Sequence, residues 1–290
     1  MGDLQISYPL PQEKEMVADL WQESFHDSTA YVELFFNRVY QPTNTLVIKR
    51  NGFIISALQM IPYKAKWEDK IIPVAYVCGV CTHPLERGKG LMKSLMRHAI
   101  LELQKKGFHF AIVIPAGPSL FNYYRELGFT SLIAHGVENR KFDSHFLTVF
   151  EKENNFSFEE CTNKHFSFFN YKQNERRSTI LHDENDFETI LQELNCCGDK
   201  AFVALHNHIP VGIAFAERLS DNTVLVKEIT ADNEKIQTAL YQYISRVFDA
   251  HYVKIHVAAK SMNDPGYGLA CNLDGQEREL HFFNMSLMHD

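Results

Sequence analysis

The segment with the strongest chemical signal is Arg87-Gly88-Lys89-Gly90, which follows an apolar stretch and precedes a helical pattern. Glycines at a helix start let backbone N–H groups approach a ligand closely, and the first N–H groups of a helix have no partner within it. Between Glu86 and Lys106 the sequence has six Lys or Arg residues against two acidic ones. Because the helix dipole adds to this positive charge, the segment predicts a binding site for a phosphate-bearing ligand.

The same glycines are open to other interpretations. A bare Gly-x-Gly pair is more typical of an ordinary tight turn, with the basic residues solvating the helix, so this alternative stays open. The sequence has no Gly-x-x-x-x-Gly-Lys-[Ser/Thr] phosphate loop. The dinucleotide-binding fingerprint would need a third glycine at the position of Lys93. A phosphate site of another kind is therefore favoured.

Three further arrangements of reactive side chains are expected to be structural. Cys81 and His83 can share a face of a strand without hydrogen bonding to each other, which disfavours a nucleophilic pair. Cys78 and Cys81 are spaced as half of a zinc site, but no second pair follows at a usable spacing. His206 and His208 flank an Asn, which is more typical of a hairpin turn than of metal ligands. We therefore expect no metal.

The periodicity of apolar residues predicts the elements that position the glycine segment. Residues 12–38 are expected to form one or two helices, and residues 45–62 a hairpin that turns at Asn51-Gly52. The elements expected after it are a strand at 71–82, a long amphipathic helix at 88–106, a short strand at 108–114 and a helix at 118–127. A strand, a helix and a second strand form a parallel crossover, so the sheet should be mixed.

The second half of the sequence repeats this order of elements weakly. In both halves an apolar strand runs into a turn centred on Asn, and a further strand and an amphipathic helix follow. We interpret this as a tandem duplication with domains at residues 1–148 and 149–290. The second copy has Ile236 and Thr238 where the first has Gly88 and Gly90. A last strand is expected at 281–285.

Two motifs resemble those of a known family. Arg87-Gly88-Lys89-Gly90-Leu91-Met92 resembles the acyl-CoA loop of the GNAT superfamily of N-acetyltransferases, [Gln/Arg]-x-x-Gly-x-[Gly/Ala], with Met92 where Gly or Ala is usual. Tyr123-Tyr124-Arg125-Glu126-Leu127-Gly128-Phe129 resembles the Phe-Tyr-x-Lys-x-Gly-Phe helix of these enzymes. The resemblance covers residues 40–132 well. The tandem plan is similar to the two acetyltransferase-like domains of the enhanced-intracellular-survival family, whose third, sterol-carrier-like domain does not fit in the rest of the sequence.

The resemblance implies a role for each residue of these motifs. The backbone of one strand end would hold the pantetheine arm and thioester of acetyl-CoA, and Gly79 would mark a β-bulge there. Backbone N–H groups of the loop would hold the pyrophosphate. The expected cofactor-binding residues are Val80, Cys81, Thr82, Arg87, Gly88, Lys89, Gly90, Leu91 and Met92. Tyr124 would be the catalytic residue that protonates the departing CoA thiolate, because a phenol with a pKa near 10 is a plausible acid.

The implied reaction is direct transfer without a covalent enzyme intermediate. An amine of the acceptor attacks the thioester carbonyl after losing a proton. The base stays open between a water chain and four residues of the first helices, Glu23, His26, Asp27 and Glu33. In the enhanced-intracellular-survival family the terminal carboxylate is the base; without the third domain, we do not expect Asp290 to take this role.

Composition excludes several other classes of protein. The 290 residues are 45% hydrophobic and 22% charged, the ordinary globular mix. The net charge of −7 disfavours a nucleic-acid partner. No run approaches the length of a membrane span, and the first residues lack the pattern of a secretory signal. We therefore expect a cytoplasmic protein with no membrane partner.

These observations predict an α/β protein of tandem GNAT-like domains, each a mixed, mostly antiparallel sheet flanked by helices. The first domain is expected to be an acetyl-CoA-dependent N-acetyltransferase that acts on a primary amine of a small molecule or a peptide. The second domain is expected to keep the fold without binding CoA, to complete the acceptor pocket and to support assembly; a homo-oligomer is left open. The alternatives are a non-catalytic CoA-binding sensor or regulatory module, and a tandem transferase that moves amino acids from charged tRNA, which the net charge disfavours.

Overall fold

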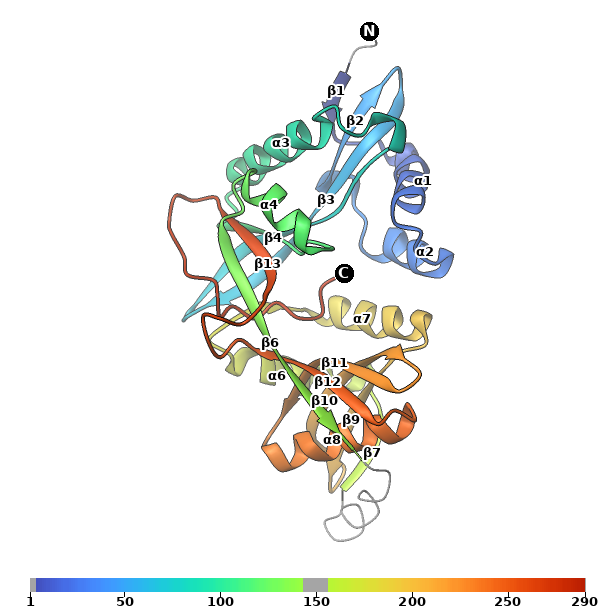
Figure 1. Ribbon diagram of the computed structural model, residues 1–290, viewed down its shortest axis with the longest axis vertical. Helices are drawn as coiled ribbons and strands as arrows, with labels where there is room; N and C mark the ends of the chain where they lie inside the picture. The colour runs from blue at the N-terminus through green and yellow to red at the C-terminus, as the bar shows by residue number, and fades with distance from the viewer. Residues whose placement is uncertain (1–3, 143–155, 290) are drawn as a thin grey trace. The chain divides into compact units, whose positions relative to one another are not determined.

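The computed structural model describes residues 4–142 and 156–289, which form two compact units (Figure 1). The first unit comprises residues 4–134, 266–282 and 289 of the described chain. The second comprises residues 135–142, 156–265 and 283–288. The domain boundary expected between residues 148 and 149 lies outside the described residues.

The first unit is a mixed sheet with helices on both faces, as the sequence predicted. The sheet order is β1-β2-β3-β4-β5-β13-β6, and β4 and β5 pair in parallel. Figure 1 shows α3 and α4 on one side of this sheet and α1 and α2 on the other. The elements are β1 Leu4–Ser7, α1 Lys14–Phe25, α2 Thr29–Arg38, β2 Thr45–Arg50, β3 Phe53–Trp67, β4 Lys70–Thr82, α3 Leu91–Lys105, β5 Phe110–Val113, α4 Pro118–Arg125, the first part of β6 Ser131–Lys141, and β13 Gly266–Asn272.

The helix α3 is fixed on the sheet by one apolar face. Its buried residues are Leu91, Leu95, Met96, Ala99 and Leu103. Their spacing of three or four residues places them on a single stripe, which packs against apolar side chains of the central strands. The helix begins at Leu91 rather than at Gly88, because the glycines before it have left-handed backbone angles that no helix continues.

The strand β13 was not expected in the first unit. It lies between β5 and β6 and pairs with both in antiparallel orientation. The strand expected at 281–285 was wrong, because this stretch forms only an isolated bridge between Thr179 and Asn284. Gly266 and Gly268 weaken the apolar pattern of β13, but a Cβ at Gly266 would lie 2.7 Å from Leu132 Cδ1, so a larger residue there would force Leu132 to shift.

The second unit repeats the order of elements of the first unit: a hairpin, a third strand, a helix and a strand parallel to the third. Its sheet order is β6-β12-β11-β10-β9-β7, and β11 and β12 pair in parallel. The elements are β7 Phe156–Glu160, α6 Phe166–Glu175, β8 Ser178–Leu181, α7 Glu184–Cys197, β9 Lys200–His206, β10 Ile209–Ser220, β11 Thr223–Ala231, α8 Glu234–Val247 and β12 Tyr252–Ala258.

Both units contain a hairpin with the same type of turn. Asn51 and Gly52 join β2 to β3, and Asn207 and His208 join β9 to β10; all four residues have positive φ. Two consecutive positive φ angles are typical of the two-residue turn that matches the twist of a hairpin. The prediction that His208 belongs to a hairpin turn is therefore confirmed. Within the described residues, no helix has the length and apolar character to cross a membrane.

Candidate active site

The start of α3 presents unpaired backbone N–H groups to open space. Gly88 and Gly90 have φ of 76° and 74°, in the left-handed region that favours glycine. The first hydrogen bond of the helix runs from Ser94 N to Gly90 O at 3.1 Å, so the N–H groups of residues 91–93 have no acceptor within the helix. No side chain caps this helix start, and a Cβ on either glycine would meet nothing within 4 Å. The turn can therefore receive an anion.

Side chains around this turn fix its shape and leave it positive. Arg87 Nε donates to Thr82 O at 3.0 Å, which ties the loop to the end of β4. Glu86 pairs with Lys89 at 3.0 Å and with Arg50 at 2.5 Å. The hydrogen bond from Lys89, together with the charges of both partners, lowers the pKa of Glu86. Two cations thus pair with one carboxylate, and Arg87 adds a further positive charge to the loop, which favours a negatively charged ligand.

The strand β4 carries a bulge just before this loop. Ala57 of β3 pairs with Cys81, and Gln59 pairs with Cys78, so β4 has one more residue than β3 in this interval. Gly79 lies in the bulge with φ of 56°. A Cβ at Gly79 would lie 2.3 Å from Cζ3 of Trp21, a buried residue of α1. The bulge expected at Gly79 is therefore present, and both its backbone angle and the packing of α1 require glycine.

Beyond the centre of the sheet, β4 continues without a strand partner on its β5 side. The parallel pairing of β4 with β5 covers only the three residues from Val74 to Tyr76 within the described chain. The strand runs on to Thr82, whereas β5 ends at Val113. Unpaired strand edges offer N–H and C=O groups to an extended ligand. Val80, Cys81 and Thr82, which the sequence predicted as cofactor-binding residues, all belong to this part of β4.

Tyr124 lies on α4 and is 6% exposed. Its ring packs against Phe129 and Tyr123, at centroid distances of 6.0 Å and 5.4 Å. Burial raises the pKa of Tyr124 well above that of an ordinary phenol, and the electrostatic influence of Tyr123 and of Cys78 on β4 adds to this. The Tyr124 hydroxyl therefore stays protonated at neutral pH and is available as a hydrogen-bond donor.

Cys81 and His83 do not form a nucleophilic pair. The Cys81 thiol is buried against the Ala57 carbonyl oxygen, at 3.8 Å, and burial raises its pKa to about 12. His83 instead accepts a hydrogen bond from Leu85 N at 3.3 Å, and its Nε2 lies 3.6 Å from Glu23 Oε2. A thiol held protonated with no base beside it is inert.

The four candidates for the base differ in their surroundings. Asp27 accepts a hydrogen bond from Trp21 Nε1 at 2.7 Å and so fixes the helix that covers the bulge. Glu23 is exposed and, through its contact with His83, reaches the segment after β4. The remaining candidates, His26 and Glu33, are exposed at the end of α1 and on α2. Glu23 is thus the candidate that contacts the segment between β4 and the glycine turn.

A segment far away in the sequence also reaches this region. The Tyr76 hydroxyl donates to the His289 carbonyl oxygen at 3.2 Å, although the two residues are 213 positions apart. The His289 ring also meets the Phe35 ring edge-on at 5.8 Å. Tyr76 is the residue at which the pairing of β4 with β5 ends. No local pattern predicts this contact; Asp290 lies outside the described residues.

Comparison with known proteins gave a family and a set of similar structures. Residues 6–132 match the family described as the acetyltransferase (GNAT) domain. No curated protein sequence matches the chain. A structure from Enterococcus faecalis V583, described as a probable N-acyltransferase, is similar at 14% identity and a TM-score of 0.76, covering 94% of this chain and 73% of that one.

Two other structures are similar over the same extent. A GCN5-related N-acetyltransferase from Kribbella flavida has 19% identity and a TM-score of 0.71, covering 94% of this chain and 72% of that one. Eis1 from Mycobacterium abscessus has 11% identity and a TM-score of 0.64, covering 94% of this chain and 74% of that one. At these identities the likeness shows a shared fold that extends over both units.

Proposed function

We propose that this chain, whose residues 6–132 are a GNAT acetyltransferase domain, moves an acetyl group from acetyl-CoA to a primary amine. The observation that carries this proposal is the left-handed glycine turn at the start of α3, which directly follows the bulged and unpaired end of β4. One feature suits a pyrophosphate and the other suits an extended amide-bearing arm. Acetyl-CoA contains both groups.

Each part of the cofactor has a proposed partner in the backbone. The N–H groups of residues 87–92 hold the pyrophosphate, helped by the helix dipole and by the surrounding cations. The backbone of Val80, Cys81 and Thr82 pairs with the pantetheine arm as an added strand would. This pairing delivers the thioester toward the bulge at Gly79. Because these contacts use main-chain groups, the departure of Met92 from the usual small residue leaves them intact.

The chemistry is a direct substitution at the thioester carbonyl. The neutral amine forms a bond to the carbonyl carbon, the C–S bond breaks, and the nitrogen loses its proton to a base. Tyr124 donates a hydrogen bond to the sulfur as negative charge develops there. Since its pKa is raised above that of a thiol, the hydroxyl keeps its proton and stabilises the departing thiolate through this hydrogen bond, and the released thiolate takes its proton from solvent.

We propose Glu23 as the side chain that takes the proton of the amine, directly or through water. Its carboxylate is exposed and lies beside His83 at the end of β4. Glu23→Gln should therefore lower kcat and leave the KM for acetyl-CoA unchanged. His83→Ala, which removes the neighbour but keeps the carboxylate, should have a smaller effect. Equal activity of Glu23→Gln and the parent protein would assign the role to water.

The decisive experiment is to mix the protein with acetyl-CoA and a panel of primary amines and to follow the release of free thiol. Tyr124→Phe keeps the ring but removes the hydroxyl, so it should slow release by about 10²-fold or more, the contribution typical of a positioned acid. Its Kd for CoA should stay close to that of the parent. Tyr123→Phe is the matched control on the same helix and should retain most of the activity.

The outcomes separate this function from its rival. Tight binding of acetyl-CoA without turnover on any amine would favour a CoA-binding sensor or regulatory module. A melting temperature that does not rise with CoA would contradict the cofactor site itself, because a ligand that binds only the folded chain must stabilise it. The nature of the amine that reacts fastest then defines the acceptor.

A further inference from the structure

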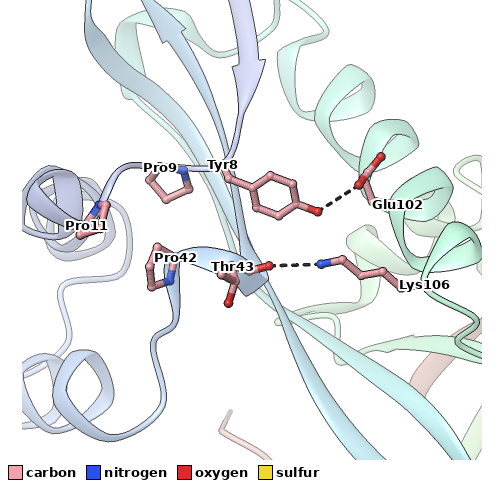
Figure 2. Close-up of a pocket in the computed structure, with 7 residues that line it drawn as sticks. All are labelled: Tyr8, Pro9, Pro11, Pro42, Thr43, Glu102 and Lys106. Atoms are coloured by element: carbon pink, nitrogen blue, oxygen red, sulfur yellow. Dashed lines mark hydrogen bonds between the residues drawn. The ribbon is translucent and has the colours of Figure 1, made fainter.

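A second cavity lies in the first unit at the opposite end of α3 from the glycine turn (Figure 2). It has a volume of about 620 Å³ and is lined by residues 8, 9, 11, 42, 43, 102 and 106. A helix rises about 1.5 Å per residue, so Lys106 lies roughly 22 Å along the axis from Leu91. The cavity is therefore separate from the proposed cofactor site. Its volume falls in the range of about 300–1,000 Å³ that small-molecule sites occupy.

The wall opposite α3 is largely apolar and rich in proline. Pro9, Pro11 and Pro42 lie on this side in Figure 2, and the ring of Tyr8 extends from it toward the helix. Proline has no N–H group, so these three residues offer a ligand the C–H surface of their rings and no backbone donor. An aromatic ring packs favourably against such surface and against the edge of a tyrosine ring. This side of the cavity therefore suits a flat apolar body.

The acidic residue of the cavity is already neutralised. One Glu102 oxygen accepts a hydrogen bond from the Tyr8 hydroxyl at 3.1 Å, and the other pairs with Lys105 at 2.9 Å. The hydrogen bonds from Lys105 and Tyr8 lower the pKa of Glu102. Because both carboxylate oxygens are engaged, Glu102 has little capacity left for a cationic ligand.

The cation of the cavity, by contrast, keeps donors for a ligand. Lys106 Nζ donates to the Thr43 carbonyl oxygen at 3.2 Å and lies 5.0 Å from the centre of the Tyr8 ring. No carboxylate pairs with Lys106 within residues 4–142 and 156–289. An ammonium group has three N–H donors, so two remain. Since Lys106 occupies a face of Tyr8, a cationic ligand would be repelled there.

We propose that this cavity binds a small monoanion with a flat apolar body, such as an arylalkyl carboxylate. The ring lies on the three prolines and the edge of Tyr8, and the carboxylate pairs with Lys106. A phosphate ester fits less well, because the cavity offers a single ammonium group rather than an arginine fork or a helix N-terminus. The proposal does not depend on the transferase reaction.

The test uses 3-phenylpropionate as the probe on the full-length protein. For its 11 heavy atoms a drug-like efficiency of about 0.3 kcal/mol per atom corresponds to a Kd in the millimolar range, which ligand-observed NMR can measure. Lys106→Gln should weaken binding about tenfold, and Lys106→Arg should retain it. The matched control is Arg97→Gln, which removes one exposed charge from the same helix away from the cavity and should change nothing.

Two further probes decide the chemistry. The amine 3-phenylpropylamine has the same ring but a positive charge, and it should bind at least about tenfold more weakly, which corresponds to about 1.4 kcal/mol. Saturating CoA should not displace 3-phenylpropionate. Equal binding of amine and carboxylate, equal binding to Lys106→Gln, or displacement by CoA would each overturn the proposal. A Pro42→Asp variant, which places a negative charge in the wall, should abolish binding even if Lys106→Gln fails to fold.

Discussion

The first and the second unit each place a bulged strand before a helix and a parallel strand. The extra residue lies between Cys78 and Cys81 on β4, and between Val226 and Glu228 on β11. In both units the parallel pairing stops early, so that the bulged strand outlasts its neighbour. The backbone of the strand–helix–strand segment is therefore similar in the two units. They differ in the partners of the polar groups in this segment.

The helix that follows the bulge begins differently in the two units. In the first, Gly90 leads into α3 without a side-chain cap. In the second, the Asn233 side chain accepts a hydrogen bond from Ile236 N at 3.1 Å, and Glu234 adds a negative charge to the first turn. An N-cap side chain satisfies the N–H groups that an anion would otherwise use. In α8 the first N–H groups are therefore bound by a side chain of the same chain, whereas in α3 they remain available to a ligand.

The region of the bulge also differs. The bulge of β4 contains Gly79, whose missing side chain leaves room for Trp21. On β11, the buried Glu228 forms an ion pair with the partly buried Arg176 and accepts a hydrogen bond from Ser286. Polar groups that bind one another need no ligand. The same backbone therefore carries the proposed cofactor site in the first unit and a structural ion pair in the second.

The largest expected effect comes from breaking this ion pair. Arg176→Met leaves the Glu228 carboxylate buried without its cation, which should lower the free energy of unfolding by about 3 kcal/mol at pH 7. The low end of the known range applies because Arg176 keeps 26% of its side chain exposed. Urea unfolding of the full chain measures the loss, while binding of acetyl-CoA should be unchanged.

Two controls identify the charge as the cause. Arg176→Met combined with Glu228→Gln removes both charges and should recover at least half of the lost stability. In the parent protein, burial alone would raise the pKa of Glu228, but Arg176 and the hydrogen bonds outweigh it and lower the pKa. A carboxyl pKa that is lower in the folded than in the unfolded chain stabilises the fold at pH values above the ordinary carboxyl range. This contribution is lost progressively as the pH falls from that range to the lowered pKa. An Arg176→Met protein with unchanged stability at pH 7 would contradict this account.

The next largest effect should come from closing the glycine turn of the first unit. Gly90→Val places a β-branched residue at φ of 74° and a side chain in the space for the pyrophosphate. Acetyl-CoA should bind about 100-fold more weakly, or by about 2.7 kcal/mol, because several charge-assisted hydrogen bonds are lost. Calorimetric titration with CoA measures the change.

Gly107→Val is the matched control at the other end of α3. Gly107 has φ of 79°, and a Cβ there would also meet nothing within 4 Å. Both substitutions should therefore strain the backbone equally, but only Gly90→Val should affect the cofactor. If the two variants bind CoA alike, the glycine turn is not where the phosphates lie.

Local signals in the sequence predicted the first unit well. The glycines before α3, the apolar stripe of α3 and the tyrosines of α4 depend on residues close together in the chain, so their spacing reports the structure directly. Contacts between distant segments left no such signal. The strand β13 pairs with β5 and β6, which lie far from it in the sequence, and Gly266 packs against Leu132; a contact between two such distant residues has no periodicity. The same holds for Tyr8 and Lys106 in the second cavity.

The alignment of the two halves was wrong at the helix start. It placed Ile236 and Thr238 in the positions of Gly88 and Gly90, but both lie inside α8. In the first unit residues 83–90 connect the strand to the helix, whereas only residues 232 and 233 do so in the second. The second unit therefore lacks the loop because the connection is shorter. The sequence spacing alone did not reveal the shorter connection, because the cap of α8 is a single side chain, that of Asn233, and not a run of glycines.

A smaller effect should follow from removing the cap of α8. Asn233→Ala deletes the side-chain oxygen that accepts from Ile236 N, so the free energy of unfolding should fall by about 1 kcal/mol. Asn233→Asp keeps an acceptor in the same place and should restore it. Urea denaturation of the three proteins gives both values. An Asn233→Ala protein as stable as the parent would mean that the cap is not what occupies this helix end.

The smallest effect, and the sharpest test of the comparison, is expected for Asn233→Gly. Glycine at an N-cap lowers stability by only a few tenths of a kcal/mol relative to Asn, yet it frees the N–H groups of α8 for an anion. CoA should nevertheless bind only once per chain, because Glu234 repels phosphate at this helix start and the Glu228 ion pair occupies the bulge. Calorimetry gives the number of sites. A second site in Asn233→Gly would show that one side-chain cap alone separates a cofactor site from a structural crossover.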